Sequence, residues 1–306
     1  MKNFTLRHRA INGDTKPLTK WGIDSEYGIL RDVLLGPPDY FSWLEASSFS
    51  KRSIRLGLAF NLEIAKKQHL EVRACFEDAG VKVHILKPDP KLVYQIFARD
   101  SSVMTPWGPI ITQLGHWWRR GEYAPVIKFY HDNDIPIFDM VTAGAFEGGD
   151  FHVVKPGTVL CGYSDTDRTS EAGLNQVKGW IEKEGWEMHT YKFDPFFVHA
   201  DVFFAMLSEN LAAMCIDVVE PELVEWVKSK GIEVITVPYK DAMNLGCNVV
   251  ALGKDRVILP REANLLKEIC EANGLYVYSP KVSMISKGGG SLHCMCQPLR
   301  RDSVNI

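Results

Sequence analysis

The sequence lacks the segments that would connect it to a membrane or to secretion. No apolar stretch reaches the roughly 18 residues needed to cross a bilayer. The N-terminal segment MKNFTLRHRAINGDTK contains no apolar core of the kind that secretory signals carry. The seven cysteines are odd in number and scattered, so they do not resemble a disulfide framework. We therefore expect no membrane partner and a location in the reducing cytoplasm.

Motifs for metals, dinucleotides and nucleic acids are missing as well. The chain has no CxxC pair and no HExxH segment, and the closely spaced Cys294 and Cys296 lack partner ligands at zinc-site spacing. The glycine fingerprint of a dinucleotide-binding sheet does not occur. The formal net charge is -3, and no run of Lys and Arg is dense enough for a nucleic-acid groove. We expect no metal site and no nucleic-acid partner.

What the sequence does contain is one pattern that recurs five times. In each unit two short apolar strands surround a turn, an amphipathic helix follows, and a β-rich strand closes the unit. Four of the five closing segments start with glycine, the residue preferred where a helix ends in a left-handed conformation. The closing segments are GVKVHIL from Gly80, DIPIFDM from Asp134, GWEMHTY from Gly185, GIEVITV from Gly231 and GLYVYSP from Gly274.

The strand pairs are equally regular, except that the first unit, YGILRDVLLGPP, shows a single strand after Tyr27. In the other units the turn signals are Trp107-Gly108, Pro156-Gly157, Glu209-Asn210 and Lys254-Asp255. Apolar residues make up 46% of the 306 and charged residues 24%, as in a globular protein with a large core. We predict an α/β protein that is one catalytic domain over residues 1–306. Its units should form a closed five-bladed β/α propeller of ββαβ units with pseudo-five-fold symmetry.

The segments that follow the closing strands carry most of the candidate catalytic side chains. In a ring these connectors lead back toward the axis, so residues far apart in the sequence would share one central pocket. The connectors are FARDSS with Asp100, FEGGDFH with Glu147 and Asp150, FVHADVFF with His199 and Asp201, MNLGCNVV with Asn244 and Asn248, and SKGGGSLHCMC with Cys294.

Cys294 is the candidate nucleophile. It follows Gly288-Gly289-Gly290, a loop slim enough to bring the backbone close to a ligand, and such a cysteine can work with a histidine placed beside it by the fold. Cys296 stays an alternative, because residues two apart share one face of an extended segment. The other five cysteines lie in helical or apolar strand contexts, and we interpret them as structural.

His199 is the candidate acid/base. Asp201 lies on the same face if the segment FFVHADVFFAM is an extended strand, and a buried polar pair there needs hydrogen-bond partners. Asp100 and Asp201 together suit a planar cation with several N–H donors, as a guanidinium is. Arg99 and Asp100 can equally form a structural ion pair. The carboxylate of Glu147 would be suited to orient the imidazole of His199.

These motifs resemble those of the guanidino-group-modifying enzymes, which include arginine deiminases, dimethylarginine dimethylaminohydrolases and glycine or inosamine amidinotransferases. The superfamily shares the five-fold propeller called the pentein fold, and the resemblance runs from about Tyr27 to Asp302. Four motifs carry it in the same order: FARD at 97–100 is similar to F-x-R-D, EGGD at 147–150 to E-G-G-D, HAD at 199–201 to H-x-D, and GGGSLHC at 288–294 to G-G-G-x-x-x-C.

The resemblance implies a role for each matched residue. It makes Cys294 the nucleophile, His199 the general acid/base and Glu147 the residue that orients His199. Asp100 and Asp201 would hold the guanidinium nitrogens.

Two arginine positions extend this set. Arg168, in DRTSEAG, is similar to the arginine with which the superfamily binds the substrate α-carboxylate, although it could also cap a helix. A second arginine near the pocket falls on Arg119 or Arg120 in WRRGEY, and we take Arg120 as substrate-binding. The adjacent Trp117-Trp118 can simply pack in the core.

The implied mechanism is attack of the Cys294 thiolate on the guanidinium carbon, with His199 protonating the departing amine. Water then displaces the sulfur in a hydrolase, and an acceptor amine does so in a transferase. Because the sulfur supplies the covalent chemistry, no cofactor is expected. The paired acids should raise the pKa of the thiol, so substrate binding would complete its activation.

The choice within the superfamily rests on size. The five units leave no room for the extra helical domain of arginine deiminases, which favours a dimethylarginase-like hydrolase acting on a small guanidino or ureido amino acid. WRRGEY and HCMCQPLRR are also similar to amidinotransferases, so amidino transfer is the alternative. The retained catalytic set argues against a non-enzymatic ribosome-binding propeller. The sequence does not decide between a monomer and a homo-oligomer.

Overall fold

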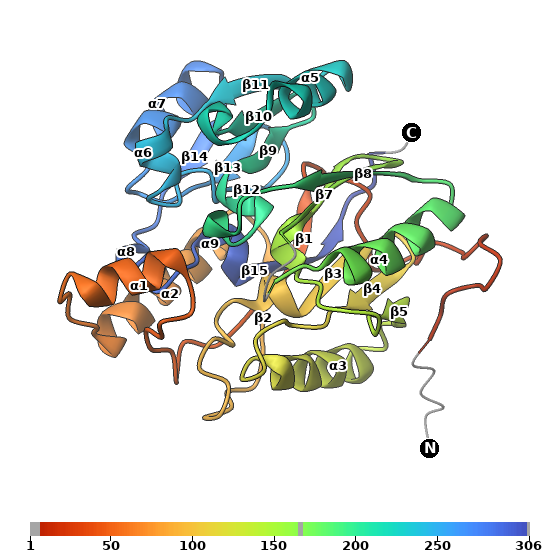
Figure 1. Cartoon of the computed structure of the whole chain (residues 1–306), viewed down its shortest axis with the longest axis horizontal. Helices are drawn as coiled ribbons and strands as arrows, with labels where there is room; N and C mark the ends of the chain where they lie inside the picture. The colour runs from red at the N-terminus through yellow and green to blue at the C-terminus, as the bar shows by residue number, and fades with distance from the viewer. Residues whose placement is uncertain (1–6, 165–167, 305–306) are drawn as a thin grey trace.

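The computed structural model describes residues 7–164 and 168–304 as a mixed α/β protein with five three-stranded sheets (Figure 1). In each sheet the middle strand pairs antiparallel with one neighbour and parallel with the other. A parallel pair needs a crossover connection, and a helix supplies it in every sheet. The predicted order of two strands, a helix and a closing strand is therefore present in four of the five sheets.

Four of the sheets take their strands in chain order. The strands are β3 (Ser102–Thr105), β4 (Gly108–Ile111) and β5 (Asp139–Met140); β6 (Phe151–Lys155), β7 (Thr158–Tyr163) and β8 (Glu187–Lys192); β9 (Phe204–Ser208), β10 (Leu211–Met214) and β11 (Glu233–Thr236); β12 (Val250–Ala251), β13 (Arg256–Ile258) and β14 (Tyr276–Tyr278). The crossover helices are α3 (Tyr123–Asp132), α4 (Glu171–Lys183), α5 (Pro221–Ser229) and α7 (Asn264–Ala272).

The remaining sheet explains why the first unit looks irregular in the sequence. Its middle strand β1 (Leu30–Leu35) runs parallel to β2 (Lys82–Ile85) across the helix α2 (Leu62–Asp78). Its antiparallel partner is β15 (Cys296–Arg301), which comes from the far end of the described chain. No local turn signal exists for that pair, because the two strands are not neighbours in the sequence.

The helix-to-strand junctions follow the predicted glycine rule. Gly80, Gly185, Gly231 and Gly274 have φ values of 78°, 81°, 72° and 81°, and each comes one residue after a helix cap. Asp134 takes the same left-handed conformation, with φ of 53°, in the unit without a glycine. Aspartate tolerates this region better than most residues, so the junction keeps its geometry.

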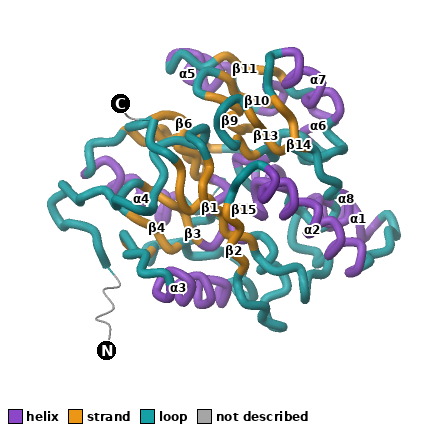
Figure 2. Tube along the Cα trace, turned by 180° about the vertical axis from the view of Figure 1, so that it is seen from behind, coloured by secondary structure: helices purple, strands orange, loops and turns teal. Residues whose placement is uncertain are grey.

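The crossover helices lie at the periphery, and the strands and connectors lie toward the middle (Figures 1 and 2). Each helix buries one stripe; α4, for example, buries Leu174, Val177 and Ile181, which follow the 3.6-residue period. Burying each such side chain stabilises the fold by roughly 1.5 to 3 kcal/mol.

Short helices and 3₁₀ turns complete the described secondary structure, and several of them lie in the connectors. The helices are α1 (Ser48–Arg55), α6 (Tyr239–Ala242), α8 (Ser283–Ser286) and α9 (Leu292–Met295), and the 3₁₀ turns are η1 (Ala98–Ser101), η2 (Arg120–Glu122), η3 (Gly148–Asp150), η4 (Pro195–Phe197), η5 (Ala200–Val202) and η6 (Ile216–Val218). Among residues 7–164 and 168–304, no helix combines the length and apolarity needed to cross a bilayer. Part of the N-terminal segment considered above, residues 1–6, lies outside the described residues. All seven cysteines are free thiols.

Candidate active site

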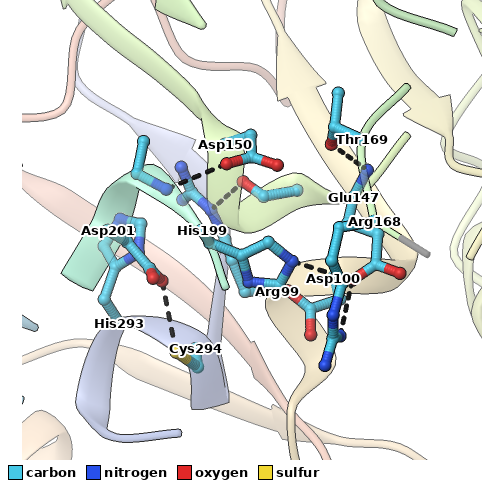
Figure 3. Close-up of polar contacts among 12 residues, drawn as sticks. Arg99, Asp100, Glu147, Asp150, Arg168, Thr169, His199, Asp201, His293 and Cys294 are labelled. Atoms are coloured by element: carbon cyan, nitrogen blue, oxygen red, sulfur yellow. Dashed lines mark hydrogen bonds and ion pairs between the residues drawn. The ribbon is translucent and has the colours of Figure 1, made fainter. Parts of the chain in front are cut away.

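The connectors bring the predicted catalytic side chains to a common point (Figure 3). Asp100 lies in η1, Asp201 in η5 and Cys294 in α9, while Glu147 and His199 come immediately before η3 and η5. All five side chains are buried. Each carrier segment directly precedes a strand of its sheet or lies one residue from it, so the sheets fix where the side chains point.

The expectation of an extended strand through His199 and Asp201 is wrong. His199 has extended backbone, with φ of -143° and ψ of 163°, but η5 begins at the next residue. The tight turn, rather than strand alternation, directs both side chains inward. Gly149 makes room for the imidazole, because a Cβ on that residue would lie 2.6 Å from Nδ1 of His199.

His199 is held between carboxylates. Its Nε2 lies 2.7 Å from Oε2 of Glu147, and its Nδ1 lies 3.7 Å from Oδ1 of Asp100. Burial disfavours the charged imidazole, but the carboxylates of Asp100 and Asp150 and the hydrogen bond to Glu147 outweigh it and raise the pKa of His199 to about 9. The imidazole therefore carries a proton at neutral pH and can give it to a departing amine.

Glu147 is a fixed carboxylate acceptor. Its Oε1 accepts from the backbone N–H of Gly115 at 2.9 Å, and its Oε2 accepts from Nη1 of Arg168 at 2.9 Å as well as from His199. Burial would raise the pKa of Glu147, but the charges of Arg168 and His199 hold it well below its ordinary value. Glu147 is therefore placed to accept a hydrogen bond from the imidazole of His199.

The sulfur of Cys294 faces an acid and an amide. Sγ lies 3.2 Å from Oδ2 of Asp201 and 3.3 Å from Nδ2 of Asn248. Burial, Asp201 and Asp100 raise the pKa of the Cys294 thiol well above its ordinary value. Without a bound cation the side chain is therefore a thiol. This is the direction in which the paired acids were expected to shift its pKa.

Cys296 points elsewhere. Because α9 makes the chain helical at Cys294, the two cysteines do not share the face of an extended segment. Cys296 is fully buried at the start of β15 in an apolar cluster with Leu35 and Ile96, where burial raises the pKa of its thiol. The structure thus places Cys294, and not Cys296, beside Asp201.

A small cavity of about 20 Å³ lies in front of the sulfur, which is room for about one water molecule. It is lined by Ser47, Tyr94, Phe97, Asp100, Arg119, Arg168, Val198, His199, Gly289, Gly290 and Cys294. In the described part of the chain, Oδ1 of Asp100 and Oδ1 of Asp201 are buried without a hydrogen-bond partner. Buried carboxylate oxygens of this kind require donors, so the site is suited to a ligand rich in N–H groups.

The structure places Arg119, rather than the expected Arg120, at the cavity. Arg119 is 1% exposed, donates to Oδ2 of Asp100 at 2.8 Å and forms two hydrogen bonds with Glu122 at 2.9 and 2.8 Å. Arg120 is exposed, and its long contacts of 3.4 Å go to the carbonyls of Leu114 and Gly115. Successive residues of a tight turn point in different directions, so only one of the pair faces inward.

Arg119 is also the main counter-charge for two buried acids, which gives a stability prediction. We expect Arg119→Met to lower the free energy of unfolding by about 3 to 5 kcal/mol, because Asp100 and Glu122 lose their buried partner. Urea denaturation measures this change in the free energy of unfolding. The matched control is Arg120→Met, which should change stability by no more than about 0.5 kcal/mol. Equal losses in both variants would contradict this assignment.

Several polar residues behind the site were assigned no catalytic or substrate-binding role from the sequence. Arg99 pairs with Glu26 at 2.7 Å rather than with Asp100, and Glu26 lies 3.2 Å from His152. His293 donates through Nδ1 to Asp201 at 2.9 Å, which against the effect of burial helps to lower the pKa of Asp201 to about 2. Asp201 therefore remains a carboxylate at neutral pH.

Some of these residues carried a usable signal. Asn248 stood among the connector residues, and His293 is adjacent to the nucleophile; the spacing of Arg119 and Glu122 by three residues is that of an ion pair on a helical turn. Asn244, the other connector asparagine, is exposed. Nothing in the local sequence around Glu26 distinguishes it.

Within residues 7–164 and 168–304, two groups of buried ligand atoms are close enough to hold a metal ion: Glu26, His152 and His293, and Asp100, Glu147 and His199. In both groups a guanidinium already neutralises a carboxylate, Arg99 in the first and Arg119 and Arg168 in the second. A divalent cation would be repelled there, so we assign no metal to either group.

The family model for "N,N dimethylarginine dimethylhydrolase, eukaryotic" matches residues 38–301. The uncharacterized protein YkgA of Bacillus subtilis is 25% identical over 278 residues, covering 90% of this chain and 94% of that protein. The N(G),N(G)-dimethylarginine dimethylaminohydrolase of Pseudomonas aeruginosa is 25% identical over 236 residues, covering 76% of this chain and 87% of that protein. The substrate-bound N-terminal domain of ArgZ, an arginine dihydrolase of cyanobacteria, superposes with a TM-score of 0.78 at 18% identity, covering 89% of this chain and 99% of that one.

Proposed function

Because the chain belongs to the N,N-dimethylarginine dimethylhydrolase family, we propose that it hydrolyses the terminal C–N bond of arginine or a close derivative through a covalent adduct on Cys294. Family membership confirms the expected superfamily of guanidino-group-modifying enzymes and a hydrolase that acts on guanidino C–N bonds. The substrate itself and the adduct are the parts that we propose.

The observation that carries the proposal is the arrangement of acceptors around one thiol. Sγ of Cys294 lies 3.2 Å from Asp201, and the cavity in front of it is also lined by Asp100 and His199. The unpartnered oxygens of the two aspartates suit the N–H groups of a planar guanidinium. In the proposed complex this cavity, which has room for about one water molecule, widens to admit the guanidinium, whose central carbon then faces the sulfur.

The proposed reaction proceeds in two displacements. The Cys294 thiolate forms a bond to the guanidinium carbon, and the bond from that carbon to the terminal nitrogen breaks as His199 protonates the leaving ammonia or alkylamine. Water then adds to the carbon of the thioether adduct while His199, now neutral, accepts a proton from it. The C–S bond breaks, which returns the thiolate and releases a ureido amino acid. The role of Glu147 is to hold the imidazole in place.

The cation is also the proposed activator of the sulfur. The two aspartates favour the thiol in the empty site, and a bound guanidinium would neutralise both of them. The thiol proton can then leave at lower pH, so that substrate binding and nucleophile formation are coupled. Because the thiolate forms only after substrate has bound, Cys294 reacts slowly with other compounds in the absence of substrate.

We further propose that the five sheets close into a five-bladed propeller with a pseudo-five-fold axis, and that residues 1–306 form one catalytic domain. The pairing of β15 with β1 joins the two ends of the described chain, and β3 packs against β15 while β12 packs against β9. Cys294, Asp100 and Glu147 come from connectors of three different sheets, and His199 and Asp201 share the connector of a fourth, as a central site requires.

Arg168 is the proposed contact for the substrate α-carboxylate. Its guanidinium lines the cavity and donates to Glu147 and to the carbonyl oxygen of Ala46, which leaves further N–H groups for a carboxylate. We expect Arg168→Ala to raise KM for arginine about 10- to 100-fold, the range of one or two charge-assisted hydrogen bonds, and to affect agmatine much less. Steady-state kinetics with both substrates measures this, with Arg120→Ala as control. Unchanged discrimination between arginine and agmatine would remove Arg168 from the carboxylate site.

The function is tested with a panel of arginine, methylated arginines, agmatine, guanidinoacetate and citrulline, read by mass spectrometry with and without an acceptor amine. A ureido product and free ammonia or alkylamine in the absence of acceptor is the expected result. Product formation only with an added amine would replace the hydrolase by the alternative, an amidinotransferase. The mass of the covalent adduct on the intact enzyme also distinguishes a hydrolase from an amidinotransferase. In a hydrolase the amino-acid part of the substrate stays attached to the sulfur through the amidino carbon, whereas in a transferase the amidino group alone stays attached.

A further inference from the structure

The sulfur of Cys294 must be stabilised by a neighbouring group once it is ionised. Two side chains among the described residues lie within hydrogen-bond distance of Sγ of Cys294. Asp201 accepts the thiol proton, and as a carboxylate it opposes the thiolate. Asn248, at 3.3 Å, is the other contact, and it carries an N–H donor.

The orientation of the Asn248 amide is determined by its neighbours. Its Oδ1 accepts from the backbone N–H groups of His293 at 2.9 Å and Cys294 at 3.3 Å. Backbone N–H groups can only donate, so the oxygen must face α9. The amide nitrogen must then face the other side, where it donates to the carbonyl oxygen of Asp201 at 3.1 Å and to Sγ. A flipped amide would set two donors against two donors.

Asn248 is also rigidly placed. Its side chain is fully buried, and it sits two residues before β12, between the connector of η5 and the α9 turn. Four hydrogen bonds hold one amide, so no reorganisation is needed when charge develops on the sulfur. Preorganised donors aimed at a developing anion are the kind of group that stabilises it most.

We propose that Asn248 is a further catalytic residue, which stabilises the thiolate of Cys294 by donating the hydrogen bond from Nδ2; its role in turnover rests on the proposed function. The donor favours the thiolate over the thiol, because a hydrogen bond to an anion is stronger than one to a neutral sulfur. When a guanidinium occupies the oxygens of Asp100 and Asp201, Asn248 continues to contact the sulfur from the protein side.

Alkylation of Cys294 by iodoacetamide tests the proposal without any substrate. Below the midpoint of its titration, the rate is proportional to the thiolate fraction. We expect Asn248→Asp and Asn248→Ala each to lower the rate about 10- to 100-fold between about pH 7 and 9, as loss of a hydrogen bond to a charged group implies. The alkylated residue is identified by tandem mass spectrometry, because Cys294 and Cys296 lie on one tryptic peptide.

The two variants separate a catalytic role from a structural one. Aspartate keeps an oxygen for the two backbone N–H groups and loses the donor, whereas alanine loses both without adding charge. A rate unchanged in Asn248→Asp overturns the proposal, and so does a rate lowered only in that charged variant. Should Asn248→Asp not fold, as judged by circular dichroism, Asn248→Ala decides alone: an unchanged rate overturns the proposal and a 10-fold or larger decrease supports it.

The matched control is Asn244→Asp. Asn244 lies on the same connector but is exposed and donates to the carbonyl oxygen of Lys240, so its substitution should leave the alkylation rate at the wild-type value. Because alkylation of Cys294 needs no substrate, the result for Asn248 stands whatever the substrate panel shows. Failure of the panel with a positive alkylation result would reject the proposed reaction and keep the thiolate contact.

Discussion

Replacement of Cys294 by alanine is expected to lower kcat at least about 10³-fold while preserving the fold, because Cys294 is the one thiol among the described residues that line the cavity. The serine at the edge of the cavity, Ser47, is engaged with Ser50 at 3.0 Å in the cap of α1. Steady-state kinetics and circular dichroism measure activity and fold separately. In intact-mass spectra, the wild-type adduct should equal the substrate less its leaving amine, and it should be absent from the variant.

The control for this prediction is Cys296→Ala. Cys296 is buried in the apolar core and lies outside the cavity lining, so activity should stay near the wild-type value. Full activity in Cys294→Ala together with loss in Cys296→Ala would move the nucleophile two residues along the chain. That result would contradict the mechanism proposed here.

The second large effect is expected from Glu147→Gln. The folded-state pKa of His199 is about 9, above its ordinary value of roughly 6.5, so its proton is kept at neutral pH and is lost as the pH rises through 9. The rate constant kcat/KM should therefore fall on the alkaline side near pH 9. Removing the charge of Glu147 and its hydrogen bond lowers the pKa of His199, and we expect the alkaline limb to move about 1 to 2 pH units lower.

The rate itself should fall about 10²- to 10⁴-fold, the range associated with general acid–base catalysis. Glu122→Gln is the matched control, since Glu122 is also a buried carboxylate paired with an arginine but has no hydrogen bond to His199. It should alter stability and leave the alkaline limb in place. An unmoved limb in Glu147→Gln would show that another group titrates near pH 9.

The local parts of the fold could be predicted from the sequence. The closing strands and their junctions at Gly80, Gly185, Gly231 and Gly274 depend on periodicity and on one backbone conformation, both of which neighbouring residues decide. The partner of β1 could not be found in this way, because a pairing between distant strands has no local signal.

In the candidate active site, too, some features could be predicted from the sequence and others could not. The motifs indicated Asp100, Glu147, His199, Asp201 and Cys294, and the structure brings all of them together. Their backbone conformations depend on packing and are harder to predict from the sequence. The segment at 199–201, expected to be extended, is extended only at His199 and becomes a 3₁₀ turn from Ala200.

The residues around the site were harder to foresee. The choice between Arg119 and Arg120 depends on the direction of one turn, which a doublet in the sequence leaves undecided. Pairings such as that of Arg99 with Glu26 join residues 73 positions apart, and such distances leave no trace in a single sequence.

The strand β15 has a consequence for how the protein is made. Translation produces β1 early, but its antiparallel partner and the adjoining Cys294 emerge only after every other strand. A nascent chain therefore carries His199 and the acids before it carries the sulfur of Cys294, and the antiparallel β1–β15 pairing joins segments from near the two ends of the described chain. Contacts between residues far apart in the sequence slow folding, so we expect the β1–β15 pairing, and with it the arrival of Cys294 beside Asp201, to form late.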